Sequence, residues 1–280
     1  MKTTASIEEL RGFLKASQGE SALVPTMGYL HSGHMKLVEQ AKRQADVCIV
    51  SIFVNPLQFG PDEDFDEYPR DLKRDLALCE AHGVDFVFHP DVDEMYPEAP
   101  EVNLGLKHMS SVLDGISRPG HFEGVITVVN KLFNIIRPDY AVFGEKDRQQ
   151  LMIVKRLVQD FNHDLEIIGV ETERERDGLA KSSRNVNLTM SEREEAPSIH
   201  AALTHGRQLI EAGHVSTEDV IREVTDFIET RISGKVDSID IYSYPDLKEV
   251  VKIKEDIVIF AAVKFSKARL IDNMLVKNNV

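Results

Sequence analysis

The sequence lacks features that would point to several common classes of protein. It has no run of about 18 apolar residues, and no apolar segment of signal-peptide length at its N-terminus. Positive charge is scarce: 33 Lys and Arg against 47 Asp and Glu give a net charge of −14. Because a basic face is needed to bind a phosphate backbone or an anionic bilayer, we expect no nucleic-acid and no membrane partner. These absences predict a soluble, cytoplasmic protein, in which a local positive pocket can still bind a small anion.

Cysteine is scarce as well. Cys48 lies in the apolar run DVCIVSIFV and Cys79 in a helical pattern, so we expect two buried thiols rather than a disulfide or a catalytic pair. The chain of 280 residues is long enough for about two domains with full cores.

The most informative segment spans residues 24–38. An apolar run that includes Leu23 suits a short buried strand, Gly28 and Gly33 mark a turn, and the apolar residues at 35, 37, 38 and 41 suit a helix packed on a sheet. Such a join places free backbone N–H groups at the carboxyl edge of the sheet, where phosphate binds readily. His31 and His34 would share one helix face and point at the same anion. The alternative is that the two histidines only cap the helix, or bind a metal, without any nucleotide.

Strand and helix patterns alternate in the first part of the chain, which predicts a parallel sheet with right-handed crossovers. Residues 47–54 are continuously apolar, the pattern of a strand covered on both faces. The other predicted elements are strands at 84–88, 141–143 and 165–170, a helix at 72–81, a helix from 121 that Pro138 stops, a helix carrying Gln150, and a first helix that begins at a capping box of Ser6 and Glu9. Residues 62–67 form an acidic run with two interpretations. It is a solvated loop, or it is a functional segment that acts as a mobile lid or lies near magnesium. Its acidic residues are Asp62, Glu63, Asp64, Asp66 and Glu67.

The alternation stops near residue 173. A charged stretch is followed by helical patterns at 192–212 and 217–232 and by strand patterns at 238–244, 257–263 and 269–272. Helices followed by strands predict a smaller α+β domain. We therefore predict a Rossmann-like α/β domain at residues 1–172 and an α+β domain at residues 173–280.

Five motifs occur in order along the chain: PTMGYLHSGH, FVNPLQFGPDEDFDEYPRD, RPGHFEGVITVVNKLFNI, GEKDRQQL and DGLAKSSRN. With ARLIDN near the C-terminus, they resemble the pantothenate synthetases, nucleotidyl transferases with HIGH-like and KMSKS-like motifs of the superfamily shared with class I aminoacyl-tRNA synthetases. The resemblance implies condensation of (R)-pantoate with β-alanine, using ATP and magnesium, to give pantothenate, AMP and diphosphate through a pantoyl adenylate. It also implies a homodimer in which residues 1–172 bind ATP and pantoate and residues 173–280 form a lid.

The resemblance also assigns residues to the substrates. The residues that would bind ATP are Met27, Gly28, Tyr29, Leu30, His31, Ser32, Gly33, His34, Gly144, Glu145, Lys146, Asp147, Glu173, Lys181, Ser182, Ser183 and Arg184. Those that would bind pantoate are Gln58 and Gln150, supported by Asn55, Arg118 and His121. The catalytic residues would be His34, His31, Lys146 and Arg184. No metal ligand is identified.

The chemistry of these side chains can be checked against the reaction. Pantoate is already ionised at neutral pH, so its attack on the α-phosphorus needs no general base. We therefore expect His34 to donate a hydrogen bond to the phosphates rather than to accept a proton. Lys146 and Arg184 are cations suited to the same charge, and Ser182 and Ser183 add hydroxyl and backbone donors.

Other residues suit uncharged contacts. Asp147, an acid beside a cation, suits ribose hydroxyls. Gln58 and Gln150 can donate and accept, so they can bind the hydroxyls and carboxylate of pantoate.

Several residues depart from the commonest pattern of the family. Tyr29 replaces a small residue, Arg148 replaces a frequent aromatic, and Lys181 replaces an apolar residue. We expect the Lys181 backbone to contact adenine while its ammonium stays in solvent. Only the backbone of Glu173 need matter near adenine.

Three other functions fit part of the pattern. A nucleotidyl transferase that acts on a phosphorylated alcohol would require more Lys or Arg than Gln58 and Gln150 provide. A regulatory protein would bind ATP without releasing diphosphate. A metal hydrolase would use His31, His34 and His121, but HxGH lacks an obvious carboxylate or cysteine to complete the site.

Overall fold

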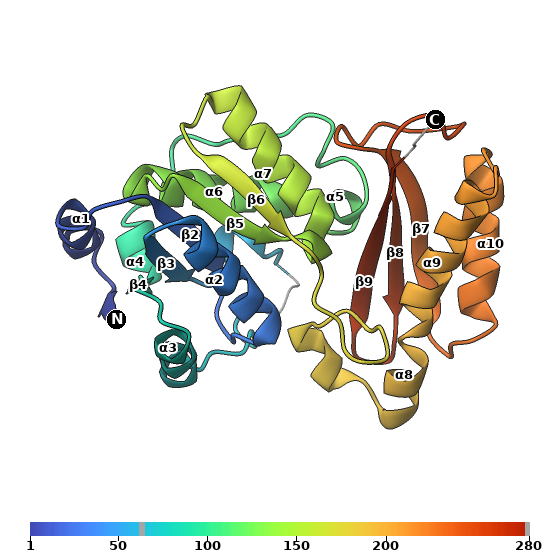
Figure 1. The fold of residues 1–280 in the computed structure, drawn as a ribbon, viewed down its shortest axis with the longest axis horizontal. Coiled ribbons are helices and arrows are strands. Elements are labelled where there is room, and N and C mark those ends of the chain that lie inside the picture. The colour runs from blue at the N-terminus through green and yellow to red at the C-terminus, as the bar shows by residue number, and fades with distance from the viewer. Residues whose placement is uncertain (62–64, 278–280) are drawn as a thin grey trace. The chain divides into compact units, whose positions relative to one another are not determined.

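The computed structural model describes residues 1–61 and 65–277, so Asp62, Glu63 and Asp64 of the acidic run lie outside the described residues. The chain divides into two compact units (Figure 1). The first comprises Met1–Glu145 and Gln149–Glu171, and the second comprises Lys146–Arg148 and Thr172–Val280. None of the helices in the described part of the chain has the length and apolar character that a membrane span requires.

The first unit is built on a six-stranded parallel sheet, which confirms the predicted Rossmann-like α/β architecture. In spatial order its strands are β1 (Lys2–Thr4), β4 (Phe86–Phe88), β3 (Val47–Ile52), β2 (Ser21–Thr26), β5 (Tyr140–Gly144) and β6 (Glu166–Val170). The helices are α1 (Ile7–Lys15), α2 (Ser32–Gln44), α3 (Leu72–Ala81), α4 (Val92–Met95), α5 (Asp114–Ser117), α6 (His121–Ile136) and α7 (Arg148–Phe161), with 3-10 turns η1 (Pro56–Gln58) and η2 (Glu145–Asp147).

Both faces of this sheet are buried, as the apolar patterns predict. Leu23 and Ile49 belong to one apolar cluster, together with side chains of α1, α6 and α7. Val24 and Val50, the next residues along the same strands, belong to a second cluster with α2 and α3. Successive residues of a strand point to opposite faces, so a strand covered on both sides is mostly apolar; in β3 the exception is the buried Ser51. The predicted strand at 47–54 is confirmed, and it ends at Ile52.

The order of the strands fixes the position of the site. From β2 the chain builds outward through β3 and β4 on one side, and through β5 and β6 on the other. The order therefore reverses between β2 and β5, and in open parallel sheets ligands bind at the carboxyl ends of the strands beside such a reversal. The segment that begins at Met27 follows β2, and Glu145 follows β5.

The second unit contains a three-stranded antiparallel sheet, which confirms the predicted α+β character. Its strands are β7 (Lys235–Ser243), β8 (Ile257–Lys264) and β9 (Arg269–Val276), and its helices are α8 (Met190–Glu195), α9 (Ser198–Glu211) and α10 (Thr217–Glu229), with the 3-10 turn η3 (Ser183–Asn187). Figure 1 shows α9 and α10 along one face of this sheet. Ile199, Val224 and Ile259 are fully or almost fully buried between the two layers.

Three local predictions are corrected. The helix predicted at 192–212 is two helices, α8 and α9, separated at Ala196 and Pro197. Ser6 caps α1 as expected, but the predicted capping box is incomplete because the Glu9 carboxylate accepts a hydrogen bond from Thr4 Oγ1. The sequence patterns also contain no sign of β1, because its three residues, KTT, are polar; β4 is equally short but apolar, and it was predicted.

Candidate active site

The turn between β2 and α2 differs from the prediction because its backbone N–H groups are already engaged. The Gly28 N–H donates to Thr26 Oγ1 at 3.2 Å. The Tyr29 and Leu30 N–H groups donate to the two carboxylate oxygens of Asp75 at 2.7 and 2.8 Å. The expected set of free amides at the start of α2 is therefore wrong for these residues.

The two histidines of the turn close the N-terminus of α2. The Gly33 N–H donates to His31 Nδ1 at 3.1 Å, and the His31 N–H donates to His34 Nδ1 at 3.2 Å. The ring centroids lie 4.1 Å apart. Because a ring nitrogen that accepts a hydrogen bond carries no proton, each imidazole carries its proton on Nε2. The capping interpretation is thus right for Nδ1, and Nε2–H is the donor of each ring.

Asn55 organises the loop after β3. It is 1% exposed, and its Nδ2 donates to Gln58 Oε1 at 3.2 Å and to the Gly124 carbonyl at 3.0 Å. Its Oδ1 accepts from the Tyr96 hydroxyl at 3.0 Å. Burial raises the pKa of Tyr96, so the phenol stays a donor at neutral pH. With Oε1 engaged, Gln58 Nε2 donates to Met27 Sδ at 2.9 Å, which brings two of the predicted loops together.

His121 links Arg118 to the same loop. Its Nδ1 lies 2.8 Å from the Gln58 carbonyl oxygen, which can only accept, so Nδ1–H is the donor. Its Nε2 then accepts from Arg118 Nη1 at 3.1 Å. The structure therefore places His121 next to Gln58 and Arg118 next to His121, with His121 in the opposite tautomer to His31 and His34.

Two adjacent glutamines at the start of α7 have different environments. Gln149 is buried, and its Nε2 donates to the carbonyls of Met109 and Val112 at 3.0 and 2.8 Å. Its Oε1 accepts from the Asp114 N–H at 3.1 Å. Gln149 therefore fixes the loop before α5. Gln150, the residue predicted to bind pantoate, is half-buried.

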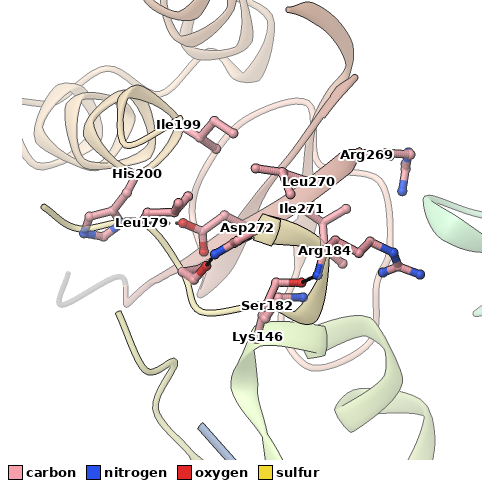
Figure 2. A pocket seen from close by; sticks show the side chains of 12 residues that line it. Lys146, Leu179, Ser182, Arg184, Ile199, His200, Arg269, Leu270, Ile271 and Asp272 are labelled. Atoms are coloured by element: carbon pink, nitrogen blue, oxygen red, sulfur yellow. Dashed lines mark hydrogen bonds and ion pairs between the residues drawn. The ribbon is translucent and has the colours of Figure 1, made fainter. Parts of the chain in front are cut away.

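The second unit contains a pocket that joins two of the predicted motifs. Lys146 of the GEKD motif lines it together with Ser182 and Arg184. Figure 2 shows these three residues toward one side of the pocket and His200 toward the other. Ser182 caps η3 and accepts from the Arg184 N–H at 3.3 Å. Arg269 and Asp272 line the pocket too, so it holds three cations, one carboxylate and the Ser182 hydroxyl, a net positive set that suits an anion with several oxygens.

The sequence predicted that the Lys181 ammonium stays in solvent, and this prediction is wrong. Its Nζ lies 3.4 Å from Glu173 Oε1, and both side chains are mostly buried, at 24% and 21% exposed. The Lys181 N–H also donates to the Glu173 carbonyl at 2.8 Å. The two residues predicted near adenine are thus paired with each other through backbone and side chain.

Comparison with known proteins identifies the family. The family model for pantoate-beta-alanine ligase matches residues 2–275. The chain belongs to the pantoate-beta-alanine ligase family. It is 51% identical over 278 residues to the pantothenate synthetase of Staphylococcus epidermidis, with 98% of this chain and 97% of that protein covered. It is 50% identical over 277 residues to the pantothenate synthetase of Oceanobacillus iheyensis, covering 99% and 98%.

Solved structures of the pantoate-beta-alanine ligase family share this fold. The pantothenate synthetase of Thermus thermophilus matches with a TM-score of 0.92 and 42% identity, covering 98% of this chain and 99% of that one. The Francisella tularensis enzyme, solved in complex with beta-gamma ATP and beta-alanine, matches with a TM-score of 0.81 and 35% identity, covering 98% and 97%. The chain is thus a ligase that condenses pantoate with β-alanine, with ATP as co-substrate and pantoyl adenylate as the intermediate.

The ligase family's C-terminal motif, ARLIDN, has a structural role that the sequence did not reveal. Asp272 is 4% exposed and accepts two hydrogen bonds from the Arg174 guanidinium, at 2.7 and 3.0 Å. Asn273 accepts from Arg148 Nε at 2.6 Å and donates to the Lys146 carbonyl at 2.9 Å. The motif therefore holds the backbone of the predicted phosphate-binding lysine. Patterns within a single sequence do not pair these residues, because they are up to 127 positions apart.

Proposed function

We propose that His31, His34, Lys146 and Arg184 bind the phosphates of ATP while a carboxylate oxygen of pantoate attacks the α-phosphorus. The bond from that phosphorus to the bridging oxygen breaks, and diphosphate leaves. The observation that carries this proposal is the pair of Nδ1 acceptor bonds, because it orients two Nε2–H donors at the carboxyl end of β2. Donors that strengthen as charge builds on the leaving group lower the barrier. No proton has to be removed from pantoate, so neither histidine acts as a base.

Gln58 and Gln150 bind pantoate in this proposal. The Asn55 amide and the Tyr96 hydroxyl support Gln58, because they fix which end of its amide accepts. Arg118 and His121 contribute through the Gln58 backbone, and Arg118 adds a cation near the carboxylate.

The remaining predicted residues bind the nucleoside and the phosphate tail. Asp147, which is exposed, accepts from the ribose hydroxyls. The backbones of Glu173 and Lys181 contact adenine. The hydroxyls of Ser182 and Ser183 bind the phosphates. The turn that also holds ATP comprises Met27, Gly28, Tyr29, Leu30, Ser32 and Gly33. Gly144 and Glu145 lie at the end of β5 beside this turn in the sheet order.

Magnesium is the expected companion of ATP. Within residues 1–61 and 65–277, no group of three or more His, Cys, Asp and Glu side chains could hold a metal ion. The acidic residues of the proposed ATP site belong to no such group, which fits magnesium held chiefly by phosphate oxygens and water, its usual coordination beside a nucleotide. When bound, the ion would neutralise charge on the phosphates. We further propose that the enzyme acts in the cytoplasm as a homodimer in which residues 173–280 act as a lid over ATP.

The first test is exchange of labelled diphosphate into ATP. The wild-type protein is assayed with ATP and magnesium plus pantoate alone, β-alanine alone or neither. Exchange that requires pantoate but not β-alanine is expected, because the adenylate forms before the amine reacts. Absence of exchange under all three conditions, with no pantothenate formed when every substrate is present, would refute the proposal.

A matched pair of variants tests the role of the His34 imidazole. His34→Asn keeps an acceptor near the position of Nδ1 but has no group at Nε2, whereas His34→Gln has an amide near Nε2 and no acceptor near Nδ1. We expect His34→Asn to keep its melting temperature and to lose roughly a hundredfold to a thousandfold in turnover. His34→Gln should retain more turnover and lose about 1 kcal/mol of stability with the cap. Near-normal turnover in His34→Asn would remove the imidazole from the mechanism.

A further inference from the structure

The turn before α2 contains a residue in an unfavourable backbone conformation. The φ angles of Gly28 and Tyr29 are +86° and +50°. Glycine adopts the left-handed region freely, whereas an aromatic residue does so only when its surroundings stabilise it. Tyr29 N–H and the next N–H both point out of the turn toward α3.

Asp75 of α3 supplies that stabilisation. Its side chain is 1% exposed, and its two oxygens accept from Tyr29 N–H and Leu30 N–H at 2.7 and 2.8 Å. A buried carboxylate requires such partners, and bonds of this kind are stronger than those between neutral groups. Arg74 Nη1 lies 3.9 Å from Asp75 Oδ1, and the Arg74 guanidinium carbon lies 5.1 Å from the centroid of the Tyr29 ring. The first part of α3 therefore contacts Tyr29 twice: Asp75 accepts from its backbone N–H, and Arg74 lies over its ring.

We infer that Asp75 is a positioning residue for ATP binding. It holds Tyr29 in the left-handed conformation and so fixes the position of the N-terminus of α2, where His31 and His34 lie. This rests on the proposed role of the two histidines. Only Leu30 separates Tyr29 from the N-cap His31. A change in the path of the turn therefore moves both imidazoles together. The Gln58 loop meets the turn at Met27, two residues before Tyr29, and is held separately by Asn55 and His121.

The first test is the affinity for α,β-methylene ATP, an analogue whose scissile bridge cannot be cleaved, measured by calorimetry. Asp75→Asn replaces one of the two acceptors with an NH2 group that faces a backbone N–H. We expect its Kd for the analogue to rise about tenfold or more, because an unsupported left-handed residue is disfavoured by about that factor. The matched control is Asp85→Asn. Asp85 also accepts a backbone N–H, that of Cys48 at 2.9 Å, but at the start of β3. This control should lose stability and keep the wild-type Kd.

The second test asks whether Asp75 acts through the backbone of Tyr29. Tyr29→Gly should recover part of the affinity in the Asp75→Asn background, and its effect should differ between the two backgrounds. If Asp75→Asn does not fold, Tyr29→Val and Tyr29→Gly replace it, since both lose the ring but only valine resists positive φ. We expect Tyr29→Val to bind the analogue about tenfold more weakly than Tyr29→Gly does.

Three results would overturn the inference: a folded Asp75→Asn that binds within twofold of wild type, the same effect of Tyr29→Gly in both backgrounds, or equal affinities for the Val and Gly variants. Failure of the histidine proposal is distinguishable, because it would appear as normal diphosphate exchange in His34→Asn, whatever Asp75→Asn does to the affinity.

Discussion

Replacing Gly124 with alanine should displace the loop at residues 55–58, which contains Gln58 and which we propose binds pantoate. Gly124 lies in α6 where the helix meets η1, and an added Cβ would lie 2.2 Å from the Leu57 carbonyl oxygen and 2.6 Å from the Gln58 nitrogen. Both are backbone atoms, so no rotamer relieves the contact. Ordinary contact begins at 3.4 Å, so the two segments must separate by about 1.2 Å (3.4 − 2.2). The bond from Asn55 Nδ2 to the Gly124 carbonyl is then stretched beyond its 3.0 Å length.

The magnitude follows from this displacement. Overpacking of this size typically costs about 1–3 kcal/mol of stability, and a shift of about 1 Å at a substrate-positioning group costs about a hundredfold in rate. We therefore expect kcat/KM for pantoate to fall about a hundredfold in Gly124→Ala. The assay is diphosphate release with pantoate varied at saturating ATP and with ATP varied at saturating pantoate, alongside thermal unfolding.

Gly12→Ala provides the matched control. Gly12 lies inside α1, and a Cβ there meets no atom within 4 Å. Alanine is favoured over glycine in a helix interior by about 0.5–1 kcal/mol, so this variant should be slightly more stable and fully active. The reasoning is refuted if folded Gly124→Ala keeps kcat/KM for pantoate within threefold of wild type.

Three further outcomes are expected. Burial raises the pKa of Cys48 and Cys79 to about 12, so a thiol reagent at pH 8 should label neither in the folded protein and both in urea; labelling of the native protein would contradict this. The Ser266 and Thr189 N–H groups lower the pKa of Glu192 to about 2 from 4.5, so its stabilisation is present above pH 4.5 and lost as pH falls toward 2. Urea titrations at pH 7 should therefore give Glu192→Gln a lower free energy of unfolding than wild type. This difference should shrink as the pH falls from 4.5 toward 2, and a difference that stays constant would disprove the prediction. Tyr96→Phe should raise KM for pantoate about fivefold and leave KM for ATP unchanged, since one hydrogen bond orienting the loop is worth about 1 kcal/mol; equal effects on both would reject the link.

The layers of the fold could be predicted because a strand buried on both faces has consecutive apolar residues, which are visible in the sequence. Val24 and Val50 face one helix layer and their neighbours Leu23 and Ile49 face the other, so both strands are continuous apolar runs in the sequence. β1 was missed because its sequence, KTT, contains no apolar run, whereas the equally short β4, FVF, does and was predicted.

The candidate site could be predicted in composition but not in its pairings. Motif spacing placed His31 and His34 at the start of a helix, yet the direction of each ring depends on which amide meets Nδ1. Asp75 lies 46 residues from Tyr29, in a helix whose pattern resembles any other amphipathic segment. Hydrogen bonds across such separations depend on the packed fold, and sequence periodicity describes only neighbours within one element.

The strand order also has a consequence for the synthesis of the chain. β2 pairs with β3 along its whole length, whereas its other neighbour is β5, through Ala22 with Tyr140 and Leu23 with Ala141. While the ribosome makes the intervening segment, one edge of an apolar strand has no partner from the mature sheet. Unpaired apolar edges are open to wrong pairing, and contacts between distant parts of a chain form slowly. The edge of β2 that pairs with β5 is thus completed only when residue 141 has emerged from the ribosome. Chaperones would be most useful to the nascent chain before that point.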